Sequence, residues 1–331
     1  MTLKLLDCTL RDGANVVGGG FDAATTSAVI GALVDARVSA IEYGHPSGIG
    51  GNEGSAKKAP LSDDEYLALA VPFLGRGTEI GMFAQPKWST EPILRKAAKT
   101  GLNFVRVGCN AGSGKAAEGT IKAARGLGLT VRFSMMKCYV LSPRELAEEA
   151  LMLQSFGAQS ITLMDSAGTM TPNMVRNYVF TVAEALDVPT GFHGHNNLGL
   201  SIANSLAAAE SGARELDACL MGMARSAGNC ATELIAAVLQ RQGRLSYVDL
   251  DTLLNFIEKE LEPAMAQDYH CPVKPLDLVY GYTGCHSNFY PNLSAVAEEK
   301  NVPLFKLIAA VCTVDRKSPS VELIRQIAGT L

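Results

Sequence analysis

Short apolar runs alternate with longer helical patterns along most of this chain, and this alternation limits the folds that it can adopt. The apolar or β-branched runs cover residues 3–8, 40–43, 79–83, 104–107, 130–135, 160–164, 190–192 and 215–220. Between them lie amphipathic stretches, the first at residues 22–36. Short parallel strands joined by helical crossovers must be covered by those helices. Eight such units predict an α/β fold, a closed (β/α)8 TIM barrel.

Helix start and stop signals support this division. Ser62 and Ser142 each precede a glutamate by three residues, the capping-box pattern, and Thr171-Pro172 places a proline at a first helical position. Glycines typical of helix ends precede several strands, at positions 101, 128, 157 and 212. An open, doubly wound sheet is the alternative that the same alternation allows.

The last part of the chain has a different pattern. After about residue 245, helical patterns follow one another at residues 248–260, 291–300, 303–312 and 320–329. A chain of 331 residues without a long polar linker suits one large domain with an appendage. We therefore expect a barrel domain over residues 1–262 and a small C-terminal helical domain over residues 263–331.

Composition excludes several classes of partner. The net charge of -4 argues against nucleic acids and anionic membranes, which bind clustered Lys and Arg. The start of the chain lacks a signal-peptide pattern, and no run of 18 apolar residues occurs, so we expect a cytoplasmic protein with a small soluble substrate. The scattered cysteines form no C-x-x-C pair, and we expect mostly free thiols in buried gaps: Cys8, Cys109, Cys138, Cys219, Cys230, Cys271, Cys285 and Cys312.

Polar residues follow the first and seventh predicted strands. Arg11 and Asp12 come after the first, and His193 and His195 end the seventh. The active site of a TIM barrel lies at this end of its strands. Alternate residues of an extended chain point to the same side, so both imidazoles can reach one ion, and the Asp12 carboxylate completes the ligand set.

Nitrogen and oxygen ligands without a thiolate suit Mn²⁺, Mg²⁺, Co²⁺ or Zn²⁺, and we expect Mn²⁺. Open coordination positions would make such an ion a Lewis acid. The plainer alternative is a pair of hydrogen-bonded histidines and an Asp12 that only pairs with Arg11. The chain has just five histidines, and the occurrence of two of them at one strand end favours the metal.

Several motifs together resemble a known family. They are T-L-R-D-G at residues 9–13, G-H-P-S-G-I-G-G at 44–51, M-D-S-A-G at 164–168, F-H-G-H-N-N-L at 192–198, A-N-S at 203–205, S-A-G-N at 226–229 and G-Y-T-G at 281–284. On these motifs, almost the whole chain resembles the DRE-TIM metallolyases, and within them the 4-hydroxy-2-oxoacid aldolases.

The resemblance implies a reversible, metal-dependent cleavage of a 4-hydroxy-2-oxoacid into pyruvate, or a related 2-oxo acid, and an aldehyde. It implies Asp12, His193 and His195 as metal ligands and Arg11 as the group that stabilises the enolate. The related Claisen-type synthases, which condense an acyl-CoA, usually carry Glu-Gln after R-D-G and a G-E-R-x-G-N loop. Ala14-Asn15 and the different loop at residues 223–229 favour the aldolase branch.

The chain also departs from the family pattern at two positions. The aldolases usually have a histidine base four residues beyond the arginine, where this chain has Asn15, and a tyrosine where it has His286. A neutral amide cannot accept the proton of the 4-hydroxyl. We therefore expect His286 as the general base, because an imidazole titrates near neutral pH, and His45 as a second candidate that could instead organise its loop.

Four residues are expected to contact the substrate: Arg11, Asn15, Ser166 and Tyr139. Ser166 would bind the carboxylate, unless it caps the next helix. Asn229 could likewise approach the metal or cap a helix.

Two other functions remain open at this stage. Lys137 or Lys87 could form an imine with the substrate instead of using a metal. The other function is that of a scaffold built on an inactive barrel, and only Asn15 supports it. Relatives often pass the aldehyde to a dehydrogenase through the C-terminal helices, so such a partner and a homo-oligomer are further expectations.

Overall fold

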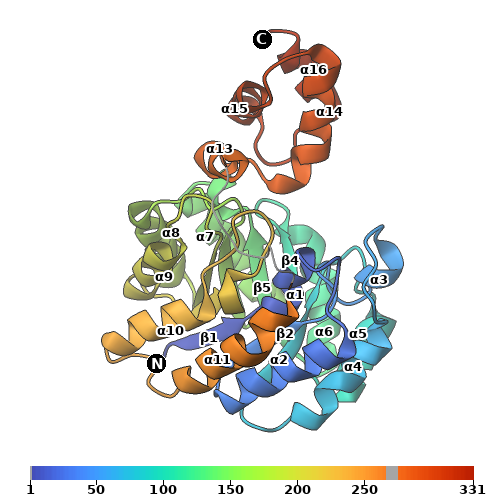
Figure 1. Cartoon of the computed structure of the whole chain (residues 1–331), viewed down its shortest axis with the longest axis vertical. Coiled ribbons are helices and arrows are strands. Elements are labelled where there is room, and N and C mark those ends of the chain that lie inside the picture. The colour runs from blue at the N-terminus through green and yellow to red at the C-terminus, as the bar shows by residue number, and fades with distance from the viewer. Residues whose placement is uncertain (1, 266–274) are drawn as a thin grey trace.

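Eight parallel strands close into a barrel in the order of the chain (Figure 1). This computed structural model describes residues 2–265 and 275–331. Because β1 pairs with β8, the open sheet is excluded and the predicted TIM barrel is confirmed. The strands are β1 Lys4–Asp7, β2 Ala40–Tyr43, β3 Glu79–Ala84, β4 Phe104–Asn110, β5 Thr130–Met136, β6 Ser160–Asp165, β7 Thr190–Gly194 and β8 Glu215–Ala218.

The strand ends differ from the prediction by a few residues. β4 reaches Asn110 and β7 reaches Gly194, beyond the apolar runs that predicted them. There the ladder continues through polar residues, with Asn110 beside Met136 and Met164 beside His193. Backbone pairing does not require an apolar side chain, so an apolar run marks the buried part of a strand rather than its end.

Helices cover the outside of the barrel (Figure 1). They are α2 Ala23–Asp35, α4 Asp63–Ala70, α5 Glu91–Thr100, α6 Glu118–Gly126, α7 Pro143–Phe156, α8 Pro172–Ala185, α9 Ser201–Glu210 and α10 Thr232–Arg241. Both predicted capping boxes form, at Ser62 and Ser142, and Gly101 and Gly157 end α5 and α7 in the left-handed conformation. Short α1 Thr9–Asp12 and α3 Gly51–Gly54 follow β1 and β2. Single 3₁₀ turns span Gly13–Asn15, Val71–Phe73, Gly114–Ala117, Cys138–Val140, Leu220–Gly222 and Ser287–Phe289.

The last four helices of the chain stand beyond the barrel, in orange to red in Figure 1. The expected helix at residues 248–260 divides into α11 Leu250–Phe256 and a π-turn at Ile257–Leu261, before α12 Glu262–Ala264. Helix α11 lies against the barrel beside α2. Then come α13 Pro275–Thr283, α14 Tyr290–Lys300, α15 Leu304–Val314 and α16 Val321–Ala328. The sequence did not predict α13, which contains Gly281, a residue of low helical propensity.

Two buried apolar clusters match these two parts of the chain. The barrel cluster ends at Leu261, whereas the second contains Tyr280, Leu293, Leu307 and Ile324. The expected boundary between residues 262 and 263 stays a prediction, since residues 266–274 lie outside the described chain.

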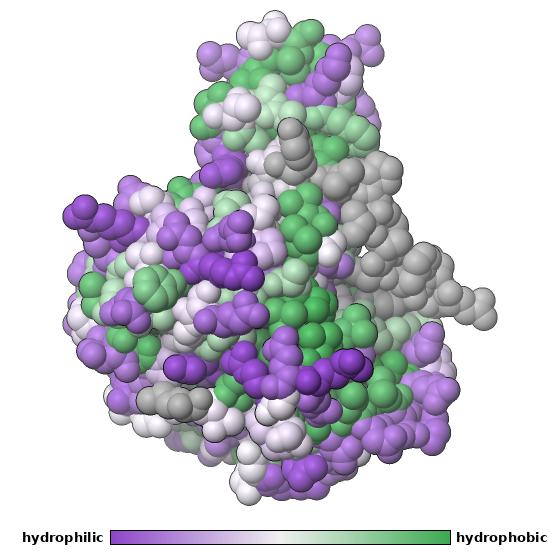
Figure 2. Space-filling view, turned by 90° about the vertical axis from the view of Figure 1, so that its left-hand side faces the viewer, coloured by the Kyte–Doolittle hydropathy of each residue, from purple (hydrophilic) through white to green (hydrophobic). Residues whose placement is uncertain are grey.

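The flank that carries α8 and α10 faces the viewer in Figure 2, where apolar groups lie between hydrophilic ones. Its exposed apolar side chains include Met174, Phe180 and Leu234. No helix in the described residues has the length and hydropathy needed to span a membrane. The seven described cysteines are free thiols, and Cys271 lies outside the described residues.

Candidate active site

The carboxyl ends of the strands surround a cavity of about 340 Å³. Most of the predicted site residues line it: Arg11, Asp12, Asn15, Ser166, His193, His195 and His286. His45 and Tyr139 do not line it. Further lining residues include Lys57, Phe83, Lys137, Arg225 and Asn288.

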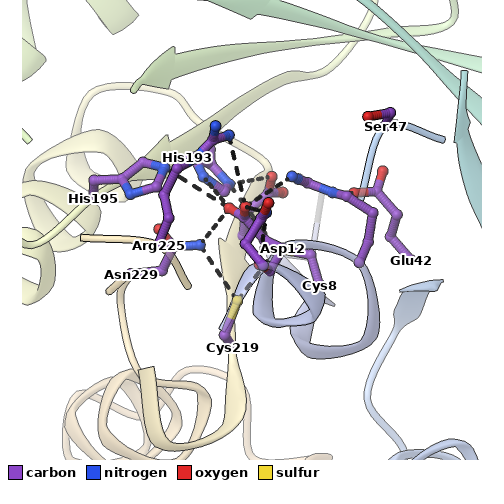
Figure 3. Close-up of polar contacts among 12 residues, drawn as sticks. Cys8, Asp12, Glu42, Ser47, His193, His195, Cys219, Arg225 and Asn229 are labelled. Atoms are coloured by element: carbon purple, nitrogen blue, oxygen red, sulfur yellow. Dashed lines mark hydrogen bonds and ion pairs between the residues drawn. The ribbon is translucent and has the colours of Figure 1, made fainter. Parts of the chain in front are cut away.

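Asp12, His193 and His195 converge at the base of this cavity (Figure 3). Asp12 Oδ2 lies 3.4 Å from His193 Nε2 and 3.8 Å from His195 Nε2. Two ligands of one ion, each about 2.1 Å from it, lie roughly 3 to 4 Å apart. Gly168 lets the β6 loop approach His195, because a Cβ there would lie 2.8 Å from the His195 carbonyl oxygen. The donor set therefore fits a divalent ion in spacing and in chemistry.

Burial and nearby charges shift the pKa values of these three side chains. Burial raises the pKa of Asp12, but the Arg11 guanidinium outweighs it and holds the pKa well below its usual range. Burial lowers the pKa of His195 to about 3, so its imidazole is neutral, the form that binds metals. Burial also opposes a charge on His193, yet its hydrogen bonds to Asp12 and Asp217 raise its pKa well above the usual value. An ion bound to His193 Nε2 would displace the proton on that nitrogen.

A buried network of charges supports His193 from behind. His193 Nδ1–H donates to Asp217 Oδ2 at 3.0 Å, and Asp217 also accepts from Arg106. Arg106 donates to both oxygens of Glu42, at 2.5 and 2.7 Å. Arg11 Nε donates to the same Glu42 at 2.5 Å. This network keeps a proton on His193 Nδ1, so Nε2, which faces Asp12, is the nitrogen that can bind an ion once its own proton has left.

The sequence analysis did not identify Glu42, Arg106 or Asp217. Each is a charged residue inside a short apolar strand, and all three are fully or almost fully buried. Charges in the interior of a barrel must be paired, so their positions in three predicted strands were a signal of a shared network.

A second group that could hold a metal, Cys8 with His193 and Asp217, shares one histidine with the first. Cys8 and Asp217 do not line the cavity, and Asp217 is already paired with Arg106. We therefore favour the Asp12 group as the metal site.

Two asparagines contact the Asp12 carboxylate. Asn15 Nδ2 donates to Asp12 Oδ1 at 3.3 Å and to its backbone carbonyl at 3.0 Å. Asn229 Nδ2 donates to Asp12 Oδ2 at 2.9 Å (Figure 3), and its Oδ1 has no hydrogen-bond partner in the described chain. Asn229 does not cap α10, whose first helical residue follows Ala231.

The two histidines proposed as bases differ in position. His45 Nε2–H donates to the Lys57 carbonyl at 2.9 Å, and its Nδ1 accepts from the Ser47 backbone N–H at 3.0 Å. Both nitrogens of His45 therefore hold the loop that carries Ser47 and Lys57, while His45 itself does not line the cavity, which favours the loop-organising alternative. His286 faces the cavity, but its Nδ1 accepts from the Asn288 backbone N–H at 3.2 Å, so the neutral ring carries its proton on Nε2.

The two lysines considered for imine chemistry also differ. Lys87 is exposed, with its ammonium 4.3 Å from the Trp88 ring centroid, and does not line the cavity. Lys137 lines the cavity, and its Nζ donates to the Lys317 carbonyl at 2.7 Å. Burial and the nearby Arg225 lower the pKa of Lys137 to about 8.

Ser166 directly follows β6, and Tyr139 lies in the turn after β5. The Ser166 hydroxyl oxygen accepts from the Lys137 backbone N–H at 3.0 Å, and Thr171 caps α8, so the capping alternative for Ser166 is excluded. Tyr139 is buried under Arg316, which donates to its carbonyl at 3.1 Å. Tyr139 therefore lies outside the cavity lining, and its expected contact with the substrate stays a prediction.

Arg225 is a cavity residue that the sequence analysis did not assign. Its Nη1 donates to Asn288 Oδ1 at 3.1 Å, and its Nη2 lies 3.9 Å from Asp12 Oδ1. An arginine in a loop after β8 has no pattern that separates it from a surface residue, so only the structure identifies it.

Comparison with known proteins agrees with this geometry. Residues 98–258 match the HMGL-like family model. Over all of this chain and 61% of that chain, the fold superposes on the carboxyl transferase domain of Rhizobium etli pyruvate carboxylase with pyruvate and biocytin, with a TM-score of 0.77 at 16% identity, which shows a shared fold.

Curated relatives are closer in sequence. The chain is 35% identical to 4-hydroxy-2-oxovalerate aldolase 2 of Nocardia farcinica, over 91% of this chain and 86% of the relative. It is also 35% identical to 4-hydroxy-2-oxovalerate aldolase of Moorella thermoacetica, over 91% of this chain and 88% of that protein. This chain therefore belongs to the 4-hydroxy-2-oxovalerate aldolase family of HMGL-like (DRE-TIM) proteins.

Proposed function

We propose that this protein is a divalent-metal-dependent aldolase, a carbon–carbon lyase that reversibly cleaves a 4-hydroxy-2-oxoacid. The products are pyruvate, or a related 2-oxo acid, and an aldehyde. The observation that carries this proposal is the convergence of Asp12, His193 and His195 beside Arg11 in one cavity, in a member of this aldolase family.

Asp12, His193 and His195 would hold the ion, with Asn229 Oδ1 as a candidate fourth ligand. When bound, a divalent ion supplies Lewis-acid polarisation of the 2-oxo carbonyl and neutralises enolate charge. We propose Mn²⁺, since histidine nitrogen and carboxylate oxygen together suit a borderline ion.

Arg11 and Ser166 bind the 2-oxo acid end of the substrate. Arg11 Nη2 is buried and has no hydrogen-bond partner in the described chain, so its N–H groups are available to an oxyanion. Glu42 and the Phe83 ring, 5.1 Å from the guanidinium carbon, hold Arg11 in place. Ser166 accepts one hydrogen bond from the backbone, which leaves its hydroxyl proton free to donate to the substrate carboxylate.

Cleavage requires a group that accepts the proton of the 4-hydroxyl. His286 was the expected base, but its Nδ1 lone pair is occupied by the Asn288 N–H and its Nε2 carries the proton. The neutral amine of Lys137 has a free lone pair, and a pKa of about 8 gives a neutral fraction near pH 7. We assign proton transfer to Lys137 and orientation of the 4-oxygen to His286 Nε2–H.

The test is an assay of pyruvate release from 4-hydroxy-2-oxopentanoate. Activity should disappear with EDTA and return with Mn²⁺, and treatment with borohydride should trap no substrate adduct. A trapped adduct on Lys137 with full activity in EDTA would instead establish imine chemistry. The absence of pyruvate in the presence of Mn²⁺, both from this substrate and from 4-hydroxy-2-oxoacids with other aldehyde portions, would contradict the aldolase function.

Association with other chains belongs to the same proposal. An aldehyde dehydrogenase that binds the C-terminal helices would receive the aldehyde, and the exposed apolar residues Phe180 and Leu234 offer a surface for a second copy. Light scattering of the purified chain tests the second association. A cytoplasmic location stays a prediction.

A further inference from the structure

The cavity holds more positive charge than the proposed reaction uses. Besides Arg11, its lining contains Lys57, Lys137 and Arg225, and Asp12 is the acidic residue among the described lining residues. Arg11 is paired with Glu42. The two charges of a divalent ion would be balanced by Asp12 and by the substrate's 2-oxo carboxylate. With Lys137 as a neutral base, Lys57 pairs with no carboxylate of the described residues, and Arg225 has only a long contact with Asp12.

Arg225 is held in place without being neutralised. Its contact with Asp12 is long, at 3.9 Å, and its Nε is buried with no hydrogen-bond partner in the described chain. The next residue, Ser226, has a left-handed φ of 60° and donates to Asp277 at 2.8 Å while it accepts from Asn197 at 2.7 Å. A strained turn fixed by side-chain hydrogen bonds gives the guanidinium a defined position.

Lys57 reaches the same region from the loop after β2. Its Nζ donates to the Asn15 carbonyl at 3.1 Å and pairs with no carboxylate of the described residues. Lys57 and Arg225 line the same cavity, and burial and the charge of Arg225 both lower the pKa of Lys57. Like charges held together in a poorly solvated site are unfavourable unless an anion joins them.

We propose, on the basis of the aldolase function above, that the natural substrate carries a second anionic group, a carboxylate or a phosphate, on its aldehyde portion. Arg225 and Lys57 bind that group. Arg225 presents Nε and a terminal nitrogen in the fork that suits two oxygens of an oxyacid, and Lys57 adds a second charge. A purely alkyl aldehyde would leave Lys57 without an anionic partner and Arg225 with only its long contact to Asp12.

The test compares condensation of pyruvate with two aldehydes of similar size and shape, in the presence of Mn²⁺. Succinic semialdehyde carries a carboxylate, and 4-methylpentanal has an isopropyl group in its place. We expect kcat/KM to be at least about 100-fold higher for the acidic aldehyde. Glyceraldehyde 3-phosphate forms the third arm, and a preference for it over succinic semialdehyde would identify the group as a phosphate.

Variants separate this inference from the proposed function. Arg225→Gln and Lys57→Met should each lower the ratio of kcat/KM for acidic over neutral aldehyde by about 10- to 100-fold, and Arg225→Lys should restore part of it. Lys87→Met removes an exposed cation outside the cavity and should leave the ratio unchanged.

Turnover of both aldehydes at equal efficiency would overturn the inference and leave the aldolase function intact. Equal losses for both aldehydes in Arg225→Gln would also overturn it, because they would place Arg225 at the shared 2-oxo acid end. Failure to condense pyruvate with any of the aldehydes would contradict the aldolase function itself, and the inference with it.

Discussion

Two nitrogen groups of the cavity, Lys137 and His286, differ in the lone pair that each offers to a substrate. The backbone around His286 holds its Nδ1, because Asn288 N–H donates to it. Burial, Arg225 and Lys137 lower the pKa of His286 well below the usual value, so it remains neutral. Lys137 Nζ donates to the Lys317 carbonyl and lies 4.8 Å from the Phe289 ring centroid, and neither contact occupies the lone pair of its neutral amine.

Lys137→Met should therefore lower kcat for cleavage by about 10²- to 10⁴-fold, the usual contribution of a general base. The pH profile gives a second readout. Since the neutral amine is the active form, kcat/KM for cleavage should rise with pH through about 8 and then level off. In the variant this rise should disappear. A loss below about threefold with an unchanged profile would remove Lys137 from proton transfer.

His286→Ala should have a smaller effect. Loss of one hydrogen bond to the 4-oxygen corresponds to a decrease in kcat/KM of about 3- to 10-fold. The pH profile should keep its shape, because Lys137 still transfers the proton. A decrease above about 100-fold together with loss of the pH dependence would restore His286 as the base, the role that the sequence suggested.

At the scale of elements, three strands contribute one charged residue each to the interior network. Glu42 lies on β2, Arg106 on β4 and Asp217 on β8, and all are buried. Through Asp217 this network orients His193, and through Glu42 it holds Arg11. The barrel interior thus connects His193, a proposed metal ligand, with Arg11, the proposed partner of the enolate.

Asp217→Asn should weaken Mn²⁺ binding by about 10- to 100-fold, because the partner of a ligating histidine sets its orientation and basicity. Calorimetric titration of metal-free protein measures this. Glu215→Gln is the matched control, since Glu215 lies on the same strand but pairs with Arg132 at 2.8 Å, away from the cavity. An unchanged affinity in Asp217→Asn would show that the network does not support the site.

Arg106→Leu should lower the free energy of unfolding by about 3 to 5 kcal/mol, because Glu42 and Asp217 would lose their shared partner in the interior. Arg76→Leu, which breaks an exposed ion pair with Asp35, should cost less than about 1 kcal/mol. Urea unfolding compares the two variants. Equal small losses would mean that the buried charges are compensated by other groups.

The sequence predicted the strands and the convergence of Asp12, His193 and His195 because both follow from local rules. Apolar runs marked all eight strands, and His193 and His195 share a side through the two-residue period of a strand. The ring nitrogens of His286 and His45 bind backbone groups of their own loops, at Asn288 and Lys57, and Tyr139 is covered by the distant Arg316. The strand period does not specify these contacts. Arg225 could not be assigned for the same reason.

At the scale of the whole molecule, the C-terminal helices complete the mouth of the barrel. His286 and Asn288 enter the cavity lining from the turn before α14, and the Lys317 carbonyl holds Lys137 from beyond α15. The C-terminal helices have an apolar cluster separate from that of the barrel. Because residues of both parts line the cavity, the proposed substrate site is formed by both parts of the chain. Motif spacing along the sequence cannot show this juxtaposition.

The metal site is the central claim, and a crystal structure of the protein with Mn²⁺ and pyruvate tests it most directly. Anomalous diffraction should show one ion within about 2.3 Å of Asp12 Oδ2, His193 Nε2 and His195 Nε2, with pyruvate beside it and Arg11. Density that shows pyruvate bound in the cavity but no ion among these three side chains, despite saturating Mn²⁺, would contradict the account.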